Sequence, residues 1–234
     1  LLQGALLFQL WYGQSHRPTR DADRLGFGPD DVPTLVSVFR SICSIAVDDG
    51  IAFDSESTAG TPIRKDAGYG GVRIDLRATL DGARLALADR RRLRRCGHAR
   101  CAAGHISDPA ARCTRTEAAC LPQATVVAEK PHAVTVLGMT NTRMKDFFDL
   151  WVLLRDATLD DAELQRAVKA TFARRRTAMP GAHPIGLSNV FADDATKQLQ
   201  WRAFLKKNKL EPMDLGEAVR TIRERALQFG FAGT

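Results

Sequence analysis

The residues of this chain that could carry out phosphate or metal chemistry begin with two aspartates in the segment RPTRDAD. Asp21 and Asp23 are one residue apart, so on a β-strand they share a face, with Cα atoms roughly 6 to 7 Å apart. Such a pair can hold Mg²⁺, which proteins bind through one or two carboxylates and substrate phosphates. A two-metal site for phosphoryl transfer needs one more carboxylate, commonly from a neighbouring strand. The alternative is an exposed strand whose two carboxylates are merely solvated.

A strand and a hairpin are the elements predicted to position these aspartates. Residues 17–27 read as a strand on which Thr19 shares a face with the two carboxylates. Residues 72–80 alternate apolar and polar side chains, and an Asp-Gly turn of the primed type follows them. These patterns predict a sheet in the first half of the chain.

Helices are predicted around and after these strands. Asp31 is expected to cap a helix, while the polar residues 54–71 are expected to form a loop. The segment RMKDFFDLWVLL predicts a strong helix, and Asp160 with Glu163 forms a capping box at the start of the next one. The apolar stripe expected on the first of these helices is Leu35, Val38, Phe39 and Ile42.

The order of these elements predicts two regions. Residues 1–156 are expected to form an α/β domain, and residues 157–234 a helical region, with the boundary near Asp156. The regular pattern of the first region resumes near Gln123, where Pro131 disfavours helical geometry at the preceding Lys130.

Composition narrows the class of protein. The chain has 234 residues, and its hydrophobic fraction of 44% and charged fraction of 26% are typical of globular proteins. No apolar run approaches the roughly 20 residues of a membrane span, there is no signal-peptide pattern, and five cysteines argue against a disulfide framework. We therefore expect a cytoplasmic protein without a membrane partner. It opens on Leu1, so we also expect a fragment that lacks its true N-terminus.

Residues 88–120 follow neither the strand nor the helix period. They hold four of the five cysteines, and eight arginines lie between Arg90 and Arg115. Much of the net charge of +7, which suggests an anionic partner such as a nucleotide or RNA, comes from this block. Codons exist for residues 88–100 that, read one base later, spell QIDVGFGDVVTP, which continues the strand alternation and places an aspartate at Arg90. We interpret residues 88–120 as a frameshifted stretch, which sequencing of the gene tests.

A competing interpretation takes the same stretch as it stands. Its cysteines and histidines could supply four zinc ligands beside a basic nucleic-acid surface, although the closing ligands form no pair at a standard finger spacing. The candidate ligands are Cys96, His98, Cys101, His105, Cys113 and Cys120.

Three blocks together resemble a known family. The segment GALLFQLWYGQSHRPTRDAD resembles the opening motif of the AbiEii/AbiGii toxins, which are nucleotidyltransferases of the polymerase-β-like fold. VVAEKPHAVTVLGMTNTRMKDFFDLWVLL resembles that family's second block, with its Glu-Lys pair and Lys-Asp-x-x-Asp helix. ATFARRR, GLSNVFADD and QWRAFLKK are similar to its helical region. The resemblance covers most of the chain except residues 88–120, and it implies a mixed sheet with helices (α/β, or α+β) followed by a C-terminal helical region.

The resemblance also implies roles for individual residues. Asp21 and Asp23 match the family's metal-binding aspartates, Lys130 matches a lysine expected to contact nucleotide phosphates, and Asp146 matches the acid of the Lys-Asp helix. Gly4 stands where the family has a glycine that begins a helix, a natural phosphate cradle, although Ala5 after it lacks a hydroxyl. The positions expected to flank these groups in nucleotide binding are Arg17, Thr19, Lys145 and Asp149.

The implied function is that of the toxin of a type IV toxin–antitoxin (abortive infection) pair. Such an enzyme moves a nucleoside monophosphate from an NTP onto a tRNA or protein acceptor with Mg²⁺, and its antitoxin is expected to be a transcriptional repressor that acts without a direct complex. The family's third acidic residue is missing where this chain has Arg90, so weak or absent transfer is expected. A catalytically inactive, degenerate member and a basic zinc or nucleic-acid-binding module remain the alternatives.

Overall fold

The chain divides into two compact units, residues Leu1–Leu121 and Pro122–Thr234. Its structure, a computed structural model, describes residues 2–13, 16–19, 21–26, 31–63, 71–93, 102–106, 116–120, 122–156, 159–226, 228 and 231. In these parts of the chain, no helix combines the length and the apolar composition that a membrane crossing requires.

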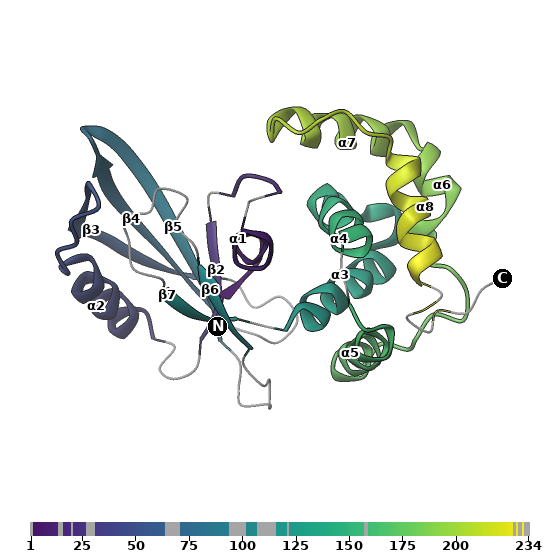
Figure 1. Cartoon of the computed structure of the whole chain (residues 1–234), viewed down its shortest axis with the longest axis horizontal. Coiled ribbons are helices and arrows are strands. Elements are labelled where there is room, and N and C mark those ends of the chain that lie inside the picture. Colours follow the sequence, from purple (N-terminus) through teal and green to yellow (C-terminus); the bar gives the residue numbers. More distant parts are fainter. Residues whose placement is uncertain are drawn as a thin grey trace. The chain divides into compact units, whose positions relative to one another are not determined.

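The first unit is built on one mixed sheet. In its described part seven strands lie in the order β3-β4-β5-β2-β1-β7-β6, and the pairs β2–β5 and β1–β7 are parallel while the others are antiparallel. The strands are β1 (Leu2–Gln3), β2 (Asp21–Gly26), β3 (Ile51–Ile63), β4 (Gly71–Leu80), β5 (Ala83–Leu93), β6 (Ala102–Ile106) and β7 (Thr116–Cys120). The helices are α1 (Leu6–Tyr12) and α2 (Val32–Cys43) (Figure 1). The predicted α/β class is therefore confirmed.

The hairpin β4–β5 forms where the sequence predicts it. Asp81 and Gly82 both have positive φ, 47° and 82°, as a primed two-residue turn requires. The alternating residues Val72, Ile74 and Leu76 of β4 are buried, so they fix the face of the sheet that carries the core.

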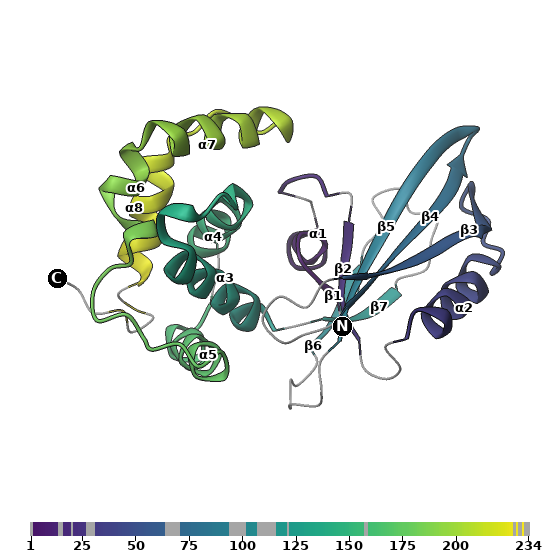
Figure 2. The same ribbon diagram turned by 180° about the vertical axis from the view of Figure 1, so that it is seen from behind.

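Helix α2 covers that apolar face, as both views of the ribbon show (Figures 1 and 2). Asp31 caps it as predicted, because the Thr34 N–H donates to Asp31 Oδ1 at 2.8 Å. The predicted stripe is wrong in part, because Val38 and Ile42 are 43% and 49% exposed. The residues that pack against the sheet are Leu35, Phe39 and Cys43, spaced by one helical turn.

Strand β3 corrects the first part of the loop predicted over residues 54–71, while residues 64–70 lie outside the described part of the chain. It pairs antiparallel with β4 at the end of the strand order, and its register shifts between Asp54 and Ala59. Its polar composition is that of an edge strand, since most of its side chains are exposed or half-buried. Gly60 allows α2 to approach, because a Cβ there would lie 2.6 Å from Val32 Cγ1.

Regular structure also continues into the segment predicted to be irregular. Strand β5 runs to Leu93 alongside β2, and the short strands β6 and β7 pair with each other farther along the chain. Backbone pairing with neighbouring strands does not require an alternating side-chain pattern, which is why the sequence does not reveal these strands. The frameshift interpretation of residues 88–120 stays a prediction.

The second unit is helical in its described part (Figure 1). Helix α3 packs against α5 and α4, and α4 packs against α8 and α7. Its largest fully buried side chains include Phe147, Phe172, Phe191 and Trp201. The helices are α3 (Gln123–Leu137), α4 (Met144–Asp156), α5 (Asp161–Arg174), α6 (Asn189–Asp193), α7 (Ala195–Lys207) and α8 (Leu215–Ala226), with 3₁₀ turns η1 (Gly138–Thr140) and η2 (Ile185–Leu187).

Helix α3 corrects one expectation. Lys130 is helical although Pro131 follows it, and Pro131 is buried within the helix. Packing against α4 and α5 offsets the local preference of a residue before proline. Helices α3 and α4 belong to the same compact unit as the later helices, and the compact units divide after Leu121. The domain boundary near Asp156 stays a prediction.

Candidate functional site

Strand β2 places the two aspartates at alternate positions, as predicted. Asp21 lies opposite Ala88 of β5, and Asp23 lies opposite Arg90. Alternate positions of a strand belong to the same face of a sheet. The side chain of Asp21 is outside the described part of the chain, so its geometry comes from the backbone register alone.

Gly4 lies directly against the Asp23 carboxylate. Gly4 has a φ of 73° in the turn between β1 and α1, and β1 pairs with β2 through Gln3 and Asp23. A Cβ at Gly4 would lie 3.0 Å from Asp23 Oδ2. Glycine is therefore needed here for two separate reasons, its left-handed backbone and the space that the carboxylate occupies.

The register between β2 and β5 shows which residue occupies the position where a third metal-binding carboxylate is expected. Arg90 lies opposite Asp23 on the adjacent strand, so its position belongs to the face of the two aspartates. The neighbouring Asp89 belongs to the other face, because it pairs with the buried Ile74 and its Oδ2 lies 2.7 Å from Arg24 Nε. The carboxylate of β5 nearest to the aspartates thus lies on the face that α2 covers.

By their chemistry, the two predicted donors suit a single hard cation. Asp21 and Asp23 could supply two oxygen ligands, the number with which Mg²⁺ is commonly held together with substrate phosphates. The register position opposite Asp23 holds an arginine rather than a carboxylate residue, and the side chain of Arg90 is outside the described part of the chain. Among the described side chains, which include Asp23 but not Asp21, no group of three His, Cys, Asp or Glu is placed to hold a metal.

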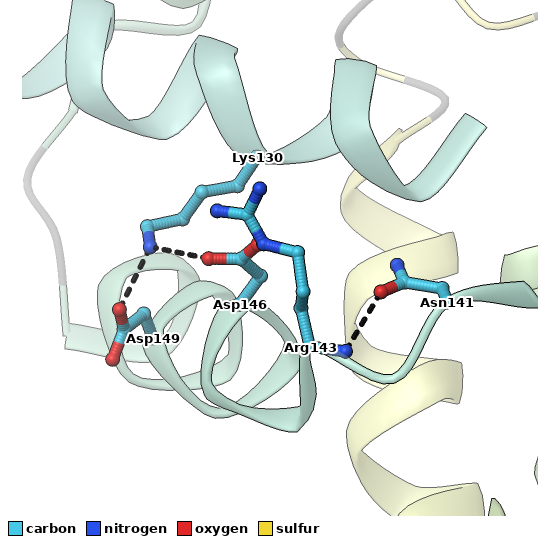
Figure 3. A network of polar contacts seen from close by, with 5 residues as sticks. All are labelled: Lys130, Asn141, Arg143, Asp146 and Asp149. Carbon is cyan, nitrogen blue, oxygen red and sulfur yellow. Dashed lines mark hydrogen bonds and ion pairs between the residues drawn. The ribbon is translucent and has the colours of Figure 1, made fainter. Parts of the chain in front are cut away.

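A second group of predicted residues comes together in the helical unit (Figure 3). Lys130 of α3 places its Nζ 3.2 Å from Asp146 Oδ1 and 2.7 Å from Asp149 Oδ2, both on α4. Side-chain exposure is 13% for Lys130, 3% for Asp146 and 1% for Asp149. Charges this deeply buried are stable only when paired, so the three groups hold one another in place.

Two further members of this cluster were not predicted. The Nε of Arg143 lies 2.7 Å from the other oxygen of Asp146, and the Arg143 N–H donates to Asn141 Oδ1 at 2.9 Å (Figure 3). The side chain of Asn141 is fully buried. The Asn-x-Arg sequence directly before the Lys-Asp helix is the signal that could have identified them, because asparagine often bonds the backbone N–H two residues on.

The residue before Lys130 binds the opposite neighbour of α3. Glu129 accepts hydrogen bonds from Arg174 and Arg175 at the end of α5. One turn on, His132 is buried, with Nε2 3.0 Å from Thr177 Oγ1. Burial lowers the pKa of His132, and the nearby Arg175 and Arg174 lower it further, while Glu129 acts in the opposite direction.

Three further predicted residues are placed by their position in the chain and their exposure. Arg17 and Thr19 lie half-buried just before β2, and Lys145 is exposed on α4. Of the candidate zinc ligands, Cys96, His98, Cys101 and Cys113 lie outside the described residues, as do the side chains of His105 and Cys120. The zinc interpretation and the site roles therefore stay predictions.

Comparison with known proteins identifies the family. The family model described as "Nucleotidyl transferase AbiEii toxin, Type IV TA system" matches residues 1–94 and 104–225. A search of curated proteins found no match. Two solved structures from Helicobacter pylori share the fold at 16% sequence identity. One is described as a candidate nucleotidyltransferase (TM-score 0.52, covering 98% of this chain and 85% of that chain), and the other is JHP933 (TM-score 0.54, 98% and 82%). Because the family model spans nearly the whole sequence, the chain belongs to the AbiEii family of nucleotidyltransferase toxins of type IV toxin–antitoxin systems.

Proposed function

We propose that this chain transfers a nucleoside monophosphate from an NTP to a hydroxyl of a tRNA or protein acceptor, with Mg²⁺ held by Asp21 and Asp23. The observation that carries the proposal is the seating of the Asp23 carboxylate against Gly4 at the turn into α1, since this pairs the predicted metal ligand with the predicted phosphate cradle. Family membership supplies the reaction class.

The transfer is a substitution at the α-phosphorus. The acceptor hydroxyl oxygen forms a bond to that phosphorus, the bond to the bridging oxygen breaks, pyrophosphate leaves, and the hydroxyl proton passes to solvent or a base. Bound Mg²⁺ supplies positive charge for the triphosphate oxygens. Gly4 leaves room for the Asp23 carboxylate beside the turn that is proposed to receive the phosphates.

Lys130 is proposed to contact nucleotide phosphates, the role that the family resemblance implies for it. Asp146 and Asp149 fix its ammonium group in one geometry, so no side-chain entropy is lost when substrate binds. Both aspartates act on substrate through Lys130 in this proposal, and Arg143 compensates part of their negative charge. The antitoxin partner is proposed to act on transcription, without a complex with this chain.

The test is incubation with each NTP labelled at the α-phosphate, Mg²⁺ and total tRNA, followed by separation of RNA and protein. Label on one acceptor is expected, and Asp21→Ala should reduce it by at least about a hundredfold, the usual scale for a lost charge-stabilising group. Glu56→Ala, which removes an exposed carboxylate of β3, serves as the control and should leave transfer unchanged. Equal labelling by Asp21→Ala and the unmodified chain would refute the metal assignment.

A second candidate is a member of the family that has lost catalysis. The residue type at position 90 favours it, because the backbone register opposite Asp23 holds an arginine where a third carboxylate residue is expected. This candidate predicts no labelled acceptor with any NTP from the unmodified chain. Transfer of labelled nucleotide by Arg90→Asp would then show that the rest of the site is intact.

A further inference from the structure

A buried lysine on α7 belongs to none of the groups assigned so far. Lys197 is 5% exposed, and its Nζ donates to the backbone carbonyl of Asn141 at 3.1 Å. The same atom lies 3.5 Å from Gln200 Oε1 and 5.5 Å from the centre of the Phe191 ring. No carboxylate among the described residues forms an ion pair with it. A buried ammonium with only neutral partners is costly, so a methionine of similar volume would pack there more cheaply.

The carbonyl that Lys197 binds belongs to the segment that leads into α4. Asn141 accepts the Lys197 bond through its backbone and the Arg143 N–H through its side chain. Arg143 in turn holds Asp146, which contacts Lys130. Polar contacts therefore run without a gap from α7, through residues 141–143, to the lysine on α3.

We propose that Lys197 is a positioning residue, which fixes the segment 141–143 so that Arg143 and Asp146 hold Lys130 in place. The inference rests on the proposed function in one respect, that Lys130 takes part in transfer. Its structural content, that Lys197 controls the placement of Lys130, stands independently. Asn141 connects the two, because its backbone carbonyl accepts the bond from Lys197 and its side chain accepts the bond from the Arg143 N–H.

The test measures the reactivity of individual lysines in the intact chain. Brief treatment with acetic anhydride, followed by digestion and mass spectrometry, gives an acylation rate for each lysine. In the unmodified chain Lys197 and Lys130 should react much more slowly than Lys206, which is exposed on the same helix as Lys197. In Lys197→Met the acylation of Lys130 should rise roughly tenfold, the scale of one lost hydrogen bond to a charged group. Lys206→Met is the matched control and should leave the Lys130 rate unchanged.

Two further measurements separate positioning from a general loss of structure. The melting temperature of Lys197→Met should equal or exceed that of the unmodified chain, because a buried charge has been removed. Where transfer is measurable, kcat should fall in Lys197→Met while the KM for NTP stays constant. Asn141→Ala, which keeps the backbone carbonyl and removes the contact to Arg143, should raise Lys130 reactivity in the same way.

The outcomes keep the two proposals apart. An unchanged Lys130 rate in both Lys197→Met and Asn141→Ala would overturn the positioning role, as would rapid acylation of Lys197 in the unmodified chain. A raised Lys130 rate together with normal transfer by Lys130→Met would leave the positioning role standing and reject Lys130 as part of the reaction. If Lys197→Met does not fold, the Asn141→Ala and unmodified-chain measurements decide the question.

Discussion

Gly4 and Asp23, which the sequence assigns to one site, lie against each other in the first unit. The carboxylate occupies the space that any side chain at Gly4 would need. A second glycine in the same unit provides a natural comparison, because Gly13 has a φ of 69° with nothing within 4 Å of its would-be Cβ. The two positions therefore share their backbone strain and differ in the contact.

Alanine at each of the two positions should separate strain from function. Gly4→Ala and Gly13→Ala should each cost roughly 1 kcal/mol of unfolding free energy, from the left-handed backbone. Only Gly4→Ala pushes against the Asp23 carboxylate, so only this variant should weaken Mg²⁺ binding, by about tenfold or more. Calorimetric Mg²⁺ titration and denaturant unfolding measure the two effects. Equal loss of Mg²⁺ binding in both variants would show that the contact with Asp23 is irrelevant.

The contacts of the Lys130 side chain cannot be read from the residues that surround it in the sequence. Its spacing from the Lys-Asp helix suggests a charged neighbour, but not which oxygens it meets. In the folded chain Lys130 contacts two buried carboxylates, those of Asp146 and Asp149. Lys197 binds the backbone of Asn141, in the segment that leads to Asp146. The acylation experiment on Lys197→Met tests this setting directly, because it measures the reactivity of the Lys130 ammonium group alone.

Among the secondary-structure elements, the pairing of β2 with β5 determines which residue occupies the position of a third carboxylate. Parallel register places Arg90 beside Asp23 and Arg91 beside Arg24. The first position is on the face of the aspartates and the second on the opposite face. An aspartate at Arg90 would complete a row of carboxylates, whereas one at Arg91 would not.

Arg90→Asp should therefore increase nucleotide transfer, and Arg91→Asp should not. Both variants change the net charge equally and sit on the same strand, so the pair isolates the face of the sheet. Removal of a guanidinium and addition of a metal ligand should raise the rate by about a hundredfold, within the range of a single charge-stabilising group. Transfer of labelled nucleotide by the two variants is the measurement. A similar gain from Arg91→Asp would point to overall charge rather than to a missing ligand.

Helix α3 connects both of its neighbours through adjacent residues. Glu129 binds the arginines at the end of α5, and Lys130 binds the aspartates of α4. Adjacent residues of a helix point in different directions, about 100° apart, so one Glu-Lys pair can hold two packed helices. This arrangement explains why α3 keeps its helical form around Pro131.

At the scale of the whole molecule, the two units have separate cores. The first is the apolar face of β4 under α2, and the second is the aromatic and aliphatic interior of the helices. A substitution or protonation in one core is expected to lower the stability of its own unit more than that of the other unit. The lowered pKa of His132 provides a way to perturb only the helical unit.

The stability of the helical unit should fall as the pH is lowered below about 6.5, the ordinary pKa of histidine. Burial lowers the pKa of His132 in the folded chain, so the unfolded chain binds its proton first. Stability is then fully present above the unfolded pKa and is lost as the pH falls through the folded value. The slope for one proton is at most about 1.4 kcal/mol per pH unit.

Hydrogen exchange measured between pH 7.5 and 5 locates this effect. Amides of α3 and α5 should lose protection on acidification, while those of β4 should change less. His132→Gln, which can still bond Thr177, should remove the difference. If the variant shows the same acid loss in α3, His132 is not its source.

The sequence by itself determined features that depend on neighbours a few residues away. The strand with its two aspartates, the Asp-Gly hairpin, the caps at Asp31 and Asp160, and the Lys-Asp helix all follow from local spacing, and the structure contains each of them. The family resemblance added the order of the blocks, and the family match confirms it.

Only the tertiary structure decided which distant residues meet. The bond from Lys197 to Asn141 joins positions 56 residues apart, and no local pattern marks a lysine for burial. The edge strand β3 and the helix around Pro131 exist because packing and sheet pairing override weak local preferences. The placement of Arg90 beside Asp23 follows from strand register, which a shift of one residue would reverse.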